Sequence, residues 1–340
     1  MYEQRRLRFP VACGFASLHP PYGEDGASES LGPAVGILPA RPGLDVRLTI
    51  RTGDLSCLRH IPAGTVDQLD ISALDPTYPR VLADDQLAHI AALAGLKQLN
   101  LTNTHIGDAG LAHILSLGSL EVLDLAGTAV SDDGVRQLGR LARLRGLNLP
   151  QGTGNTGIAV VAALPDLEML AAISTRVSDE GLPPLSSCRA LARLHLANTA
   201  IHGWGLRHLR GLAQLMVLDV AHTRIADSAI DSIECLGTLL ALDLGGCAIS
   251  DPSLARLIQL NKLQELGLTE TRVTDEGIAL LQGLPDLRRL DLAGTAISDR
   301  AIPFLARLAS LEELILLDTQ VSDGALTQLR SDHPRLRIVR

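Results

Sequence analysis

The chain has 340 residues, of which 46% are hydrophobic and only 2% aromatic, and its formal net charge is −8. This acidic balance argues against a surface for nucleic acid or an anionic membrane, and no apolar run approaches the roughly 18–20 residues that span a bilayer. The five cysteines show no paired spacing and no C-x-x-C, which indicates a reducing compartment or uninvolved thiols.

The first 44 residues contain many prolines and glycines and show no repeating pattern. We therefore expect residues 1–44 to form an irregular or flexible N-terminal segment. Its apolar stretch, Phe9–Leu18, contains Pro10 and Gly14 and is too short for a secretory signal. We expect a cytoplasmic protein, with a secreted effector as the alternative.

Residues 45–95 resemble two atypical repeats of the pattern that fills the rest of the chain. Alternating apolar residues predict a strand in each of them, at Leu48 and Ile50 and then at Leu69 and Ile71. Apolar residues at helical spacing follow each strand, and Asp85–Leu93 is the clearer of the two helices. Terminal repeats of a stack must cover the open end of its core, so we expect residues 45–95 to act as a cap.

Ten regular repeats occupy residues 96–334, and residues 335–340 form the C-terminal end. The repeats open at Leu96, Leu120, Leu144, Leu167, Leu191, Leu215, Leu239, Leu263, Leu287 and Leu311. The starts are 24 residues apart, except for one 23-residue step after Leu144. Their common skeleton is L-x-x-L-x-L-x-x-T-x-I-x-D, with the aspartate in eight of the ten, and a short helical pattern follows it. A fixed period of this size predicts a solenoid of stacked units.

Within a repeat, the opening leucine is position 1, and the other positions are counted from it. Positions 4 and 6 alternate with polar or small residues, as in a strand, and positions 16, 19 and 22 form an apolar helical stripe. Threonine at position 9 can satisfy backbone groups of the neighbouring turn. Aspartate at position 13, just before the helix, is predicted to be its N-cap.

These elements predict an α/β fold, in which parallel strands about 4.8 Å apart line a concave face and short helices cover the convex face. Because helices are wider than strands, such a stack curves into a horseshoe. From residue 45 to the end, the skeleton resembles the leucine-rich repeat, L-x-x-L-x-L-x-x-[NCT]-x-L. Residues 271–278, TRVTDEGI, are similar to bacterial repeats of the T-x-V-[ST]-D-x-G-L type.

The repeats are also similar to the cysteine-containing repeats of F-box proteins, where Cys247 takes the typical position 9. The resemblance implies a leucine-rich repeat solenoid (horseshoe) that binds proteins, and it implies no particular partner. The F-box similarity, with lysine only at Lys97 and Lys262, raises the alternative of a ubiquitin-ligase adaptor or a secreted effector.

Positions 3, 5, 7 and 8 are expected to line the concave face. The residues there that we predict to contact a partner are Asp124, Arg193, His195, Asp219, His222, Asp243 and Asp291. On adjacent strands His195, Asp219 and Asp243 lie side by side, with His222 nearby. Two carboxylates and two imidazoles can bind a divalent metal or share a proton, so a metal protein or enzyme is the alternative.

The repeat at Leu191 departs from the pattern, because glycine replaces its position-13 aspartate and is followed by Trp204, the only tryptophan. An exposed tryptophan is a plausible anchor for a partner, and one folded over its neighbours would fill a gap; both readings stay open.

The function that these patterns favour is a non-enzymatic protein-interaction module that binds a protein partner through its concave strand face and ascending loops. No Ser/His/Asp or Cys/His set has a convincing placement, so we expect no catalytic residues. We expect a monomer without a cofactor or a metal, and without contacts to nucleic acid or membrane.

Overall fold

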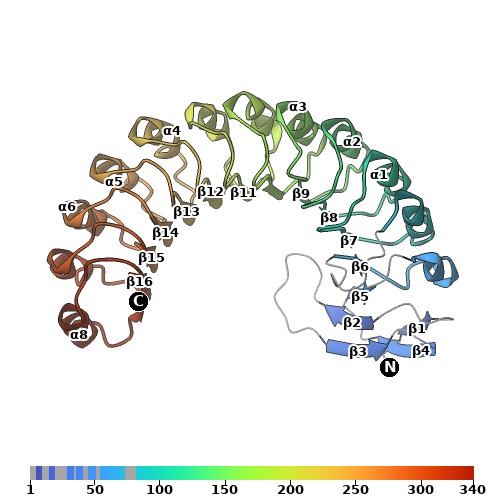
Figure 1. Ribbon diagram of the computed structural model, residues 1–340, viewed down its shortest axis with the longest axis horizontal. Coiled ribbons are helices and arrows are strands. Elements are labelled where there is room, and N and C mark those ends of the chain that lie inside the picture. The colour runs from blue at the N-terminus through green and yellow to red at the C-terminus, as the bar shows by residue number, and fades with distance from the viewer. Residues whose placement is uncertain are drawn as a thin grey trace. The chain divides into compact units, whose positions relative to one another are not determined.

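The computed structural model describes residues 5–9, 15–19, 29–33, 36–40, 45–50, 54–72 and 82–340. The chain divides into two compact parts, residues 1–170 and residues 171–340. In both parts, short strands lie along one side and helices along the opposite side (Figure 1).

The first part begins with strands β1 (Arg5–Phe9), β2 (Phe15–His19), β3 (Glu29–Pro33) and β4 (Gly36–Ala40). Strand β1 pairs antiparallel with β4, and β2 pairs antiparallel with both β3 and β5 (Asp45–Thr49). Strand β2 therefore covers the edge of β5, the first strand of the parallel stack, and a covered edge cannot pair with another chain. No sequence period marks β1–β4, because antiparallel pairing does not require a 24-residue repeat.

Parallel pairing starts at β5 and continues through the first part. The strands are β6 (Gln68–Asp70), β7 (Gln98–Asn100), β8 (Val122–Asp124) and β9 (Gly146–Asn148), and β10 (Met169–Ala171) lies at the division. The helices are η1 (Ser56–His60), η2 (Asp84–Ala92), α1 (Asp108–Ile114), α2 (Asp132–Gln137), η3 (Leu138–Arg140), α3 (Asn155–Ile158) and η4 (Ala159–Ala163). Helix η2 confirms the helix predicted at Asp85–Leu93.

The second part repeats the same arrangement. Its strands are β11 (Arg193–His195), β12 (Val217–Asp219), β13 (Ala241–Asp243), β14 (Glu265–Gly267), β15 (Arg289–Asp291), β16 (Glu313–Ile315) and β17 (Arg337–Val339), all parallel in sequence order. Its helices are η5 (Asp179–Gly181), η6 (Pro183–Ser187), η7 (Trp204–Leu209), η8 (Asp227–Ala229), α4 (Ile230–Ile233), α5 (Asp251–Leu257), α6 (Asp275–Ile278), η9 (Ala279–Gly283), η10 (Asp299–Ala301), α7 (Ile302–Leu305) and α8 (Asp323–Asp332).

The core lies between the strands and the helices, as the apolar periodicity predicts. In the repeat that opens at Leu287, the strand side contributes buried Leu287, Leu290, Leu292 and Ile297, and the helix side contributes buried Ala301, Ile302, Leu305 and Leu308. Burying one such aliphatic side chain contributes about 1.5–3 kcal/mol, so each repeat adds its own layer to the core. No helix in the described part of the chain is both long and apolar enough to span a membrane.

The prediction that the position-13 aspartate caps its own helix is wrong. The residue before it is the N-cap, and in four repeats the hydroxyl of that serine or threonine accepts a backbone N–H of the first turn. The aspartate is the first helical residue, and its carboxylate reaches the next repeat. There it accepts the backbone N–H of the N-cap residue, as in the bond from the Ser298 amide to Asp275 Oδ1, 2.7 Å long.

These bonds join successive repeats in both parts. The acceptor and the amide donor are Asp84 and Gly107, Asp108 and Ser131, Asp132 and Gly154, Asp227 and Ser250, Asp251 and Thr274, Asp275 and Ser298, and Asp299 and Ser322, at 2.6–2.8 Å. Asp179 likewise accepts the amides of His202 at 2.7 Å and Gly203 at 3.0 Å. Where the N-cap is serine or threonine, its hydroxyl also donates to the second carboxylate oxygen. We call this set the aspartate ladder. Charge-assisted bonds of this kind hold each helix start against the preceding one.

The threonine at position 9 also bonds differently from the prediction. Its hydroxyl donates to the carbonyl three residues earlier in its own repeat, as Thr271 Oγ1 does to Leu268 O at 2.7 Å. The exception is Cys247, whose thiol donates to Val220 O of the preceding repeat at 3.3 Å. Thus position 9 closes the turn after the strand of the same repeat, while position 13 joins repeats.

Candidate interaction surface

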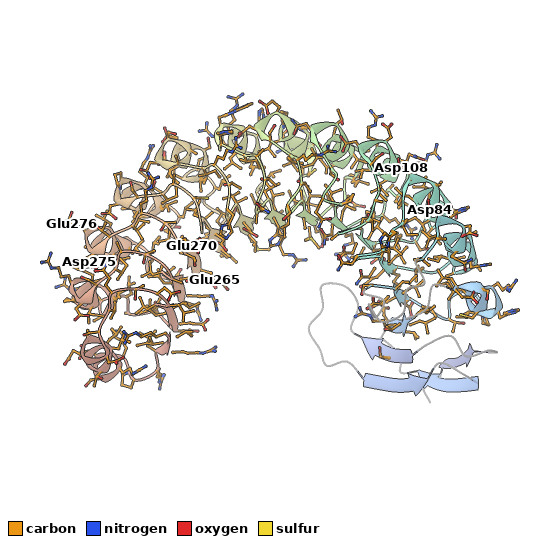
Figure 2. The ribbon with its side chains drawn as sticks, in the orientation of Figure 1. Asp84, Asp108, Glu265, Glu270, Asp275 and Glu276 are labelled. Atoms are coloured by element: carbon orange, nitrogen blue, oxygen red, sulfur yellow. The ribbon has the colours of Figure 1, made fainter. Side chains whose placement is uncertain are left out.

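The strand side of the second part presents two rows of side chains. In-register pairing places Arg193, Val217, Ala241, Glu265, Arg289 and Glu313 next to one another at position 3. It also places His195, Asp219, Asp243, Gly267, Asp291 and Ile315 next to one another at position 5. Figure 2 shows Glu265 on the strand side of this part and Glu276 on the helix side. The predicted neighbourhood of His195, Asp219 and Asp243 is therefore present.

Each position-5 aspartate ends its strand with a local hydrogen bond. One carboxylate oxygen accepts the backbone N–H two residues later, at 3.1 Å for Asp219, 2.9 Å for Asp243 and 3.0 Å for Asp291. Short polar side chains favour this turn, so part of the reason for aspartate here is structural. The other oxygen of Asp219 lies 3.4 Å from His195 Nδ1.

A hollow of about 250 Å³ opens on this face. It is lined by His195, Val217, Leu218, Asp219, Ala241, Leu242, Asp243, Glu265, Leu266, Gly267, Arg289 and Asp291. We call it the strand-face hollow. Its width comes partly from Gly267, the one position of the row from Asp219 to Asp291 that lacks a side chain. A Cβ atom there would lie 2.4 Å from Asp243 Oδ1, so the Asp243 carboxylate occupies that space.

The charges of the strand-face hollow are not balanced within it. Arg289 donates a hydrogen bond to Glu313 on the next strand, so the Arg289 side chain is directed toward that strand. Glu313 also forms an ion pair with Arg337, at 3.1 Å. Asp243, Glu265 and Asp291 form no ion pair with any residue that the structure describes. Arg289 lies between Glu265 and Glu313 at position 3, but its ion pair in the described part of the chain is with Glu313 and not with Glu265.

Asp243 has an altered proton affinity. Although its side chain is solvent-accessible, the walls of the hollow partly desolvate the carboxylate and raise the pKa of Asp243 above its ordinary value. The neighbouring charges of Asp219 and Asp291 raise it further, against the lowering effect of the Gly245 N–H bond and of His222. The folded protein thus disfavours the charged form of this group.

The remaining predicted residues have different placements. His222 is exposed at position 8 with a left-handed backbone, φ 53°, and its ring lies over Gly246, where a Cβ atom would meet Nδ1 at 2.3 Å. Arg193 is half-buried in the position-3 row beside Val217. Neither lines the strand-face hollow, and in the described part of the chain no group of three or more His, Cys, Asp or Glu residues is placed to hold a metal ion.

Trp204 begins η7 and is 43% exposed, which supports the first of the two readings left open by the sequence. Arg207 stacks on it, with Cζ 5.2 Å from the ring centroid, a cation–π arrangement. The tryptophan follows Gly203, whose φ of +103° suits glycine alone, and a Cβ atom there would meet the Ala229 methyl at 2.3 Å. Trp204 is not among the residues of the strand-face hollow.

Asp124 lies in the first part, on β8. It lines a smaller hollow of about 150 Å³ together with Arg47, Gln68, Leu69, Gln98, Leu99, Asn100 and Val122. The lining of this hollow holds one arginine, Arg47, and one carboxylate, Asp124, so its formal charges are more nearly balanced than those around Asp243.

Sequence reasoning did not identify three members of the strand-face hollow, Val217, Ala241 and Gly267. Gly267 interrupts the row of aspartates at position 5, and this interruption could have indicated the hollow from the sequence. Val217 and Ala241 are apolar residues at outward-facing position 3, and only the register of the strands shows that they border the aspartates.

A family model described as Leucine Rich repeat matches residues 96–115, 119–139 and 238–257. No curated protein matches the chain. Among solved structures, the chain is similar to an internalin (inlF) from Listeria monocytogenes, with a TM-score of 0.52 and 19% identity over 74% of this chain and 82% of that one. It is also similar to the plant peptide hormone receptor RGFR1, solved in complex with RGF2, with a TM-score of 0.49 and 18% identity over 88% of this chain and 47% of the receptor chain.

A third similar structure is a leucine-rich repeat protein from Leptospira interrogans, with a TM-score of 0.45 and 16% identity over 81% of this chain and 90% of that one. The matched repeats and the internalin structure confirm the predicted leucine-rich repeat fold. The bacterial repeat type and the similarity to F-box proteins remain predictions of the sequence.

Proposed function

We propose that this protein is a non-enzymatic interaction module that binds a protein partner through the strand face of residues 171–340. The observation that carries the proposal is the row Asp219, Asp243 and Asp291, which lies open on that face with little internal charge compensation. The leucine-rich repeat fold supports it, because the family resemblance implies protein binding. Trp204 provides a second, separate contact candidate on the helix side.

The raised pKa of Asp243 adds a physical argument. A carboxylate whose charged form is disfavoured by folding weakens the fold at neutral pH, and such groups persist where activity needs them. A partner that supplies a compensating group would remove this penalty. The cytoplasmic location, the monomeric state and the absence of catalysis remain predictions of the sequence.

The test is affinity capture with the immobilised full chain. The strand-face variant Asp219→Asn/Asp243→Asn/Asp291→Asn removes three charges from the hollow and keeps side-chain size. The control Asp166→Asn/Glu276→Gln/Asp286→Asn removes three charges from exposed residues outside it. We expect a protein that is captured by the wild type and the control and lost with the strand-face variant. Equal capture by all three proteins would contradict the proposed surface.

A further inference from the structure

We propose that the strand-face hollow receives a basic segment of the partner protein, with an arginine or lysine side chain seated beside Asp243 and Asp291. This inference rests on the proposed function and specifies the chemistry of the partner. It places the segment across strands β12 to β15, on the face that the sheet leaves uncovered.

Charge complementarity is the first argument. Four carboxylates line the hollow, at Asp219, Asp243, Glu265 and Asp291, against one arginine and one histidine. The arginine, Arg289, is already engaged by Glu313, and His195 lies beside Asp219 alone. Like charges on neighbouring strands repel one another. A cation from outside is therefore attracted by Asp243, Glu265 and Asp291, the three carboxylates that lack a described counter-ion.

The shape of the row gives the second argument. The register puts Gly267 between Asp243 and Asp291 at position 5. Strands in a sheet are spaced about 4.8 Å apart, so the two carboxylates flank a gap of about 10 Å at the backbone. The Asp243 carboxylate leans over Gly267, where a Cβ atom would lie 2.4 Å from its Oδ1. A guanidinium or ammonium group seated between this carboxylate and Asp291 can therefore approach both.

The apolar lining gives the third argument. Val217 and Ala241 border the aspartates on the position-3 row and are half-buried. Arginine and lysine bury their methylene stems on apolar surface while the charged group stays with polar partners. A basic side chain therefore suits both the apolar lining and the carboxylates of the hollow. An acidic side chain would be repelled by Asp243, Glu265 and Asp291.

The experiment pans a random peptide library against the full wild-type chain and measures selected synthetic peptides on the two triple variants defined above. We expect the recovered peptides to be enriched in arginine and lysine. We expect their affinity to fall at least about tenfold on the strand-face variant and to change less than about twofold on the control. Their affinity should also fall as salt rises, since salt screens exposed charges.

The outcomes separate this inference from the proposed function. Peptides that depend on Asp219, Asp243 and Asp291 but lack basic residues overturn the basic partner and leave the strand face as the interaction surface. Peptides that bind the wild type and the strand-face variant equally overturn both. If basic peptides lose the same affinity on both variants, their binding depends only on the net charge of the protein. That result would also contradict the proposed binding site in the hollow.

Discussion

At the residue scale, Thr153 stands out, because its hydroxyl is the one buried side-chain polar atom among the described residues that lacks a hydrogen-bond partner. Its hydroxyl is fully buried and makes no hydrogen bond. The 23-residue repeat is one residue shorter before this point, so Thr153 takes the position where other repeats bury valine or isoleucine. A buried hydroxyl without a partner costs free energy that an apolar side chain of the same shape does not.

The variant Thr153→Val should therefore raise the free energy of unfolding by about 1 kcal/mol. The matched comparison is Thr104→Val, which removes a hydroxyl bonded to Leu101 O at 2.7 Å and should lower stability by about 1 kcal/mol. Urea denaturation followed by circular dichroism measures both. Destabilisation by Thr153→Val would show that the hydroxyl has an unrecognised partner.

Asp243 gives a pH-dependent prediction. Its folded-state pKa is raised, so the folded state holds the proton more tightly, and stability is lost as pH rises through the folded pKa. The variant Asp243→Asn keeps an acceptor for the Gly245 N–H and removes this loss. We expect it to be more stable than the wild type at neutral pH, with the gain vanishing below about pH 4.

Thermal unfolding at several pH values checks the Asp243 prediction. The variant Asp286→Asn removes one charge from an exposed residue outside the hollow and is the control for the loss of a surface charge. A neutral-pH loss of stability in Asp243→Asn would mean that the carboxylate helps the fold, and the argument for a functional charge would fail.

At the scale of the element, the aspartate ladder explains why repeats carry D-x-G. The glycine at position 15 faces the aspartate of the preceding repeat: a Cβ atom at Gly277 would lie 2.2 Å from Asp251 Oδ1. Ala301 and Ala325 occupy the same position in later repeats, so a methyl group is accommodated there. Ser253 at this position adds a hydrogen bond, which its hydroxyl donates to Asp227.

The variant Asp251→Ala should cost about 2 kcal/mol, because the Thr274 N–H and hydroxyl lose their charged acceptor. Asp323 is the matched control: it has the same repeat position and also begins a helix, but its bond is to Arg340 at the surface. Asp323→Ala should cost less than about 0.5 kcal/mol. Equal losses in urea denaturation would assign the effect to the helix start rather than to the joint between repeats.

The sequence predicted the strands, helices and core because each depends on residues within one repeat. It assigned the aspartate to the wrong helix because the donor of its hydrogen bond lies about one repeat later in the chain. Strands β1–β4 were not predicted, since antiparallel pairing leaves no mark in a 24-residue period. In the candidate surface, the aspartate row was predictable from position 5, but the hollow required the register that brings Gly267, Val217 and Ala241 together.

For the whole molecule, pH limits stability from both sides. Desolvation favours a higher pKa for Asp227, but hydrogen bonds from Ser250 and Ser253 together outweigh it and lower the pKa. Bonds from Ser322 lower the pKa of Asp299. Carboxylates with lowered pKa values contribute stability above about pH 4 and lose it as pH falls. Asp227 and Asp299 therefore help to set an acid limit of stability.

The alkaline limit involves Lys97. Burial lowers the pKa of Lys97, but hydrogen bonds and charges from Asp45 and Asp67 outweigh this effect and raise it. Lys97 Nζ lies 2.6 Å from Asp45 and 3.4 Å from Asp67, both largely buried. A raised lysine pKa contributes stability that is complete below about pH 10 and is lost as pH rises through the folded value.

The variant Lys97→Met should lower stability at neutral pH by about 2 kcal/mol, less than for a fully buried pair because the lysine side chain is partly exposed. It should also reduce the stability loss at alkaline pH. Lys262, the other lysine, is exposed, and Lys262→Met should change neither quantity measurably. Urea denaturation at neutral and alkaline pH distinguishes the two variants.

Two regular repeats lack the ladder aspartate, since Asn155 begins the helix of the repeat at Leu144, and the second of them limits how the repeats can be exchanged. The repeat at Leu191 has Gly203 in place of the aspartate. The next repeat, at Leu215, has Ala226 in place of the serine or threonine whose hydroxyl would donate to that aspartate. Residues 191–214 inserted before an ordinary repeat would supply no carboxylate, so the N-cap amide and hydroxyl of that repeat would lose their acceptor. Recombination, natural or engineered, should therefore preserve residues 191–238 as one cassette, while ordinary repeats can be duplicated singly.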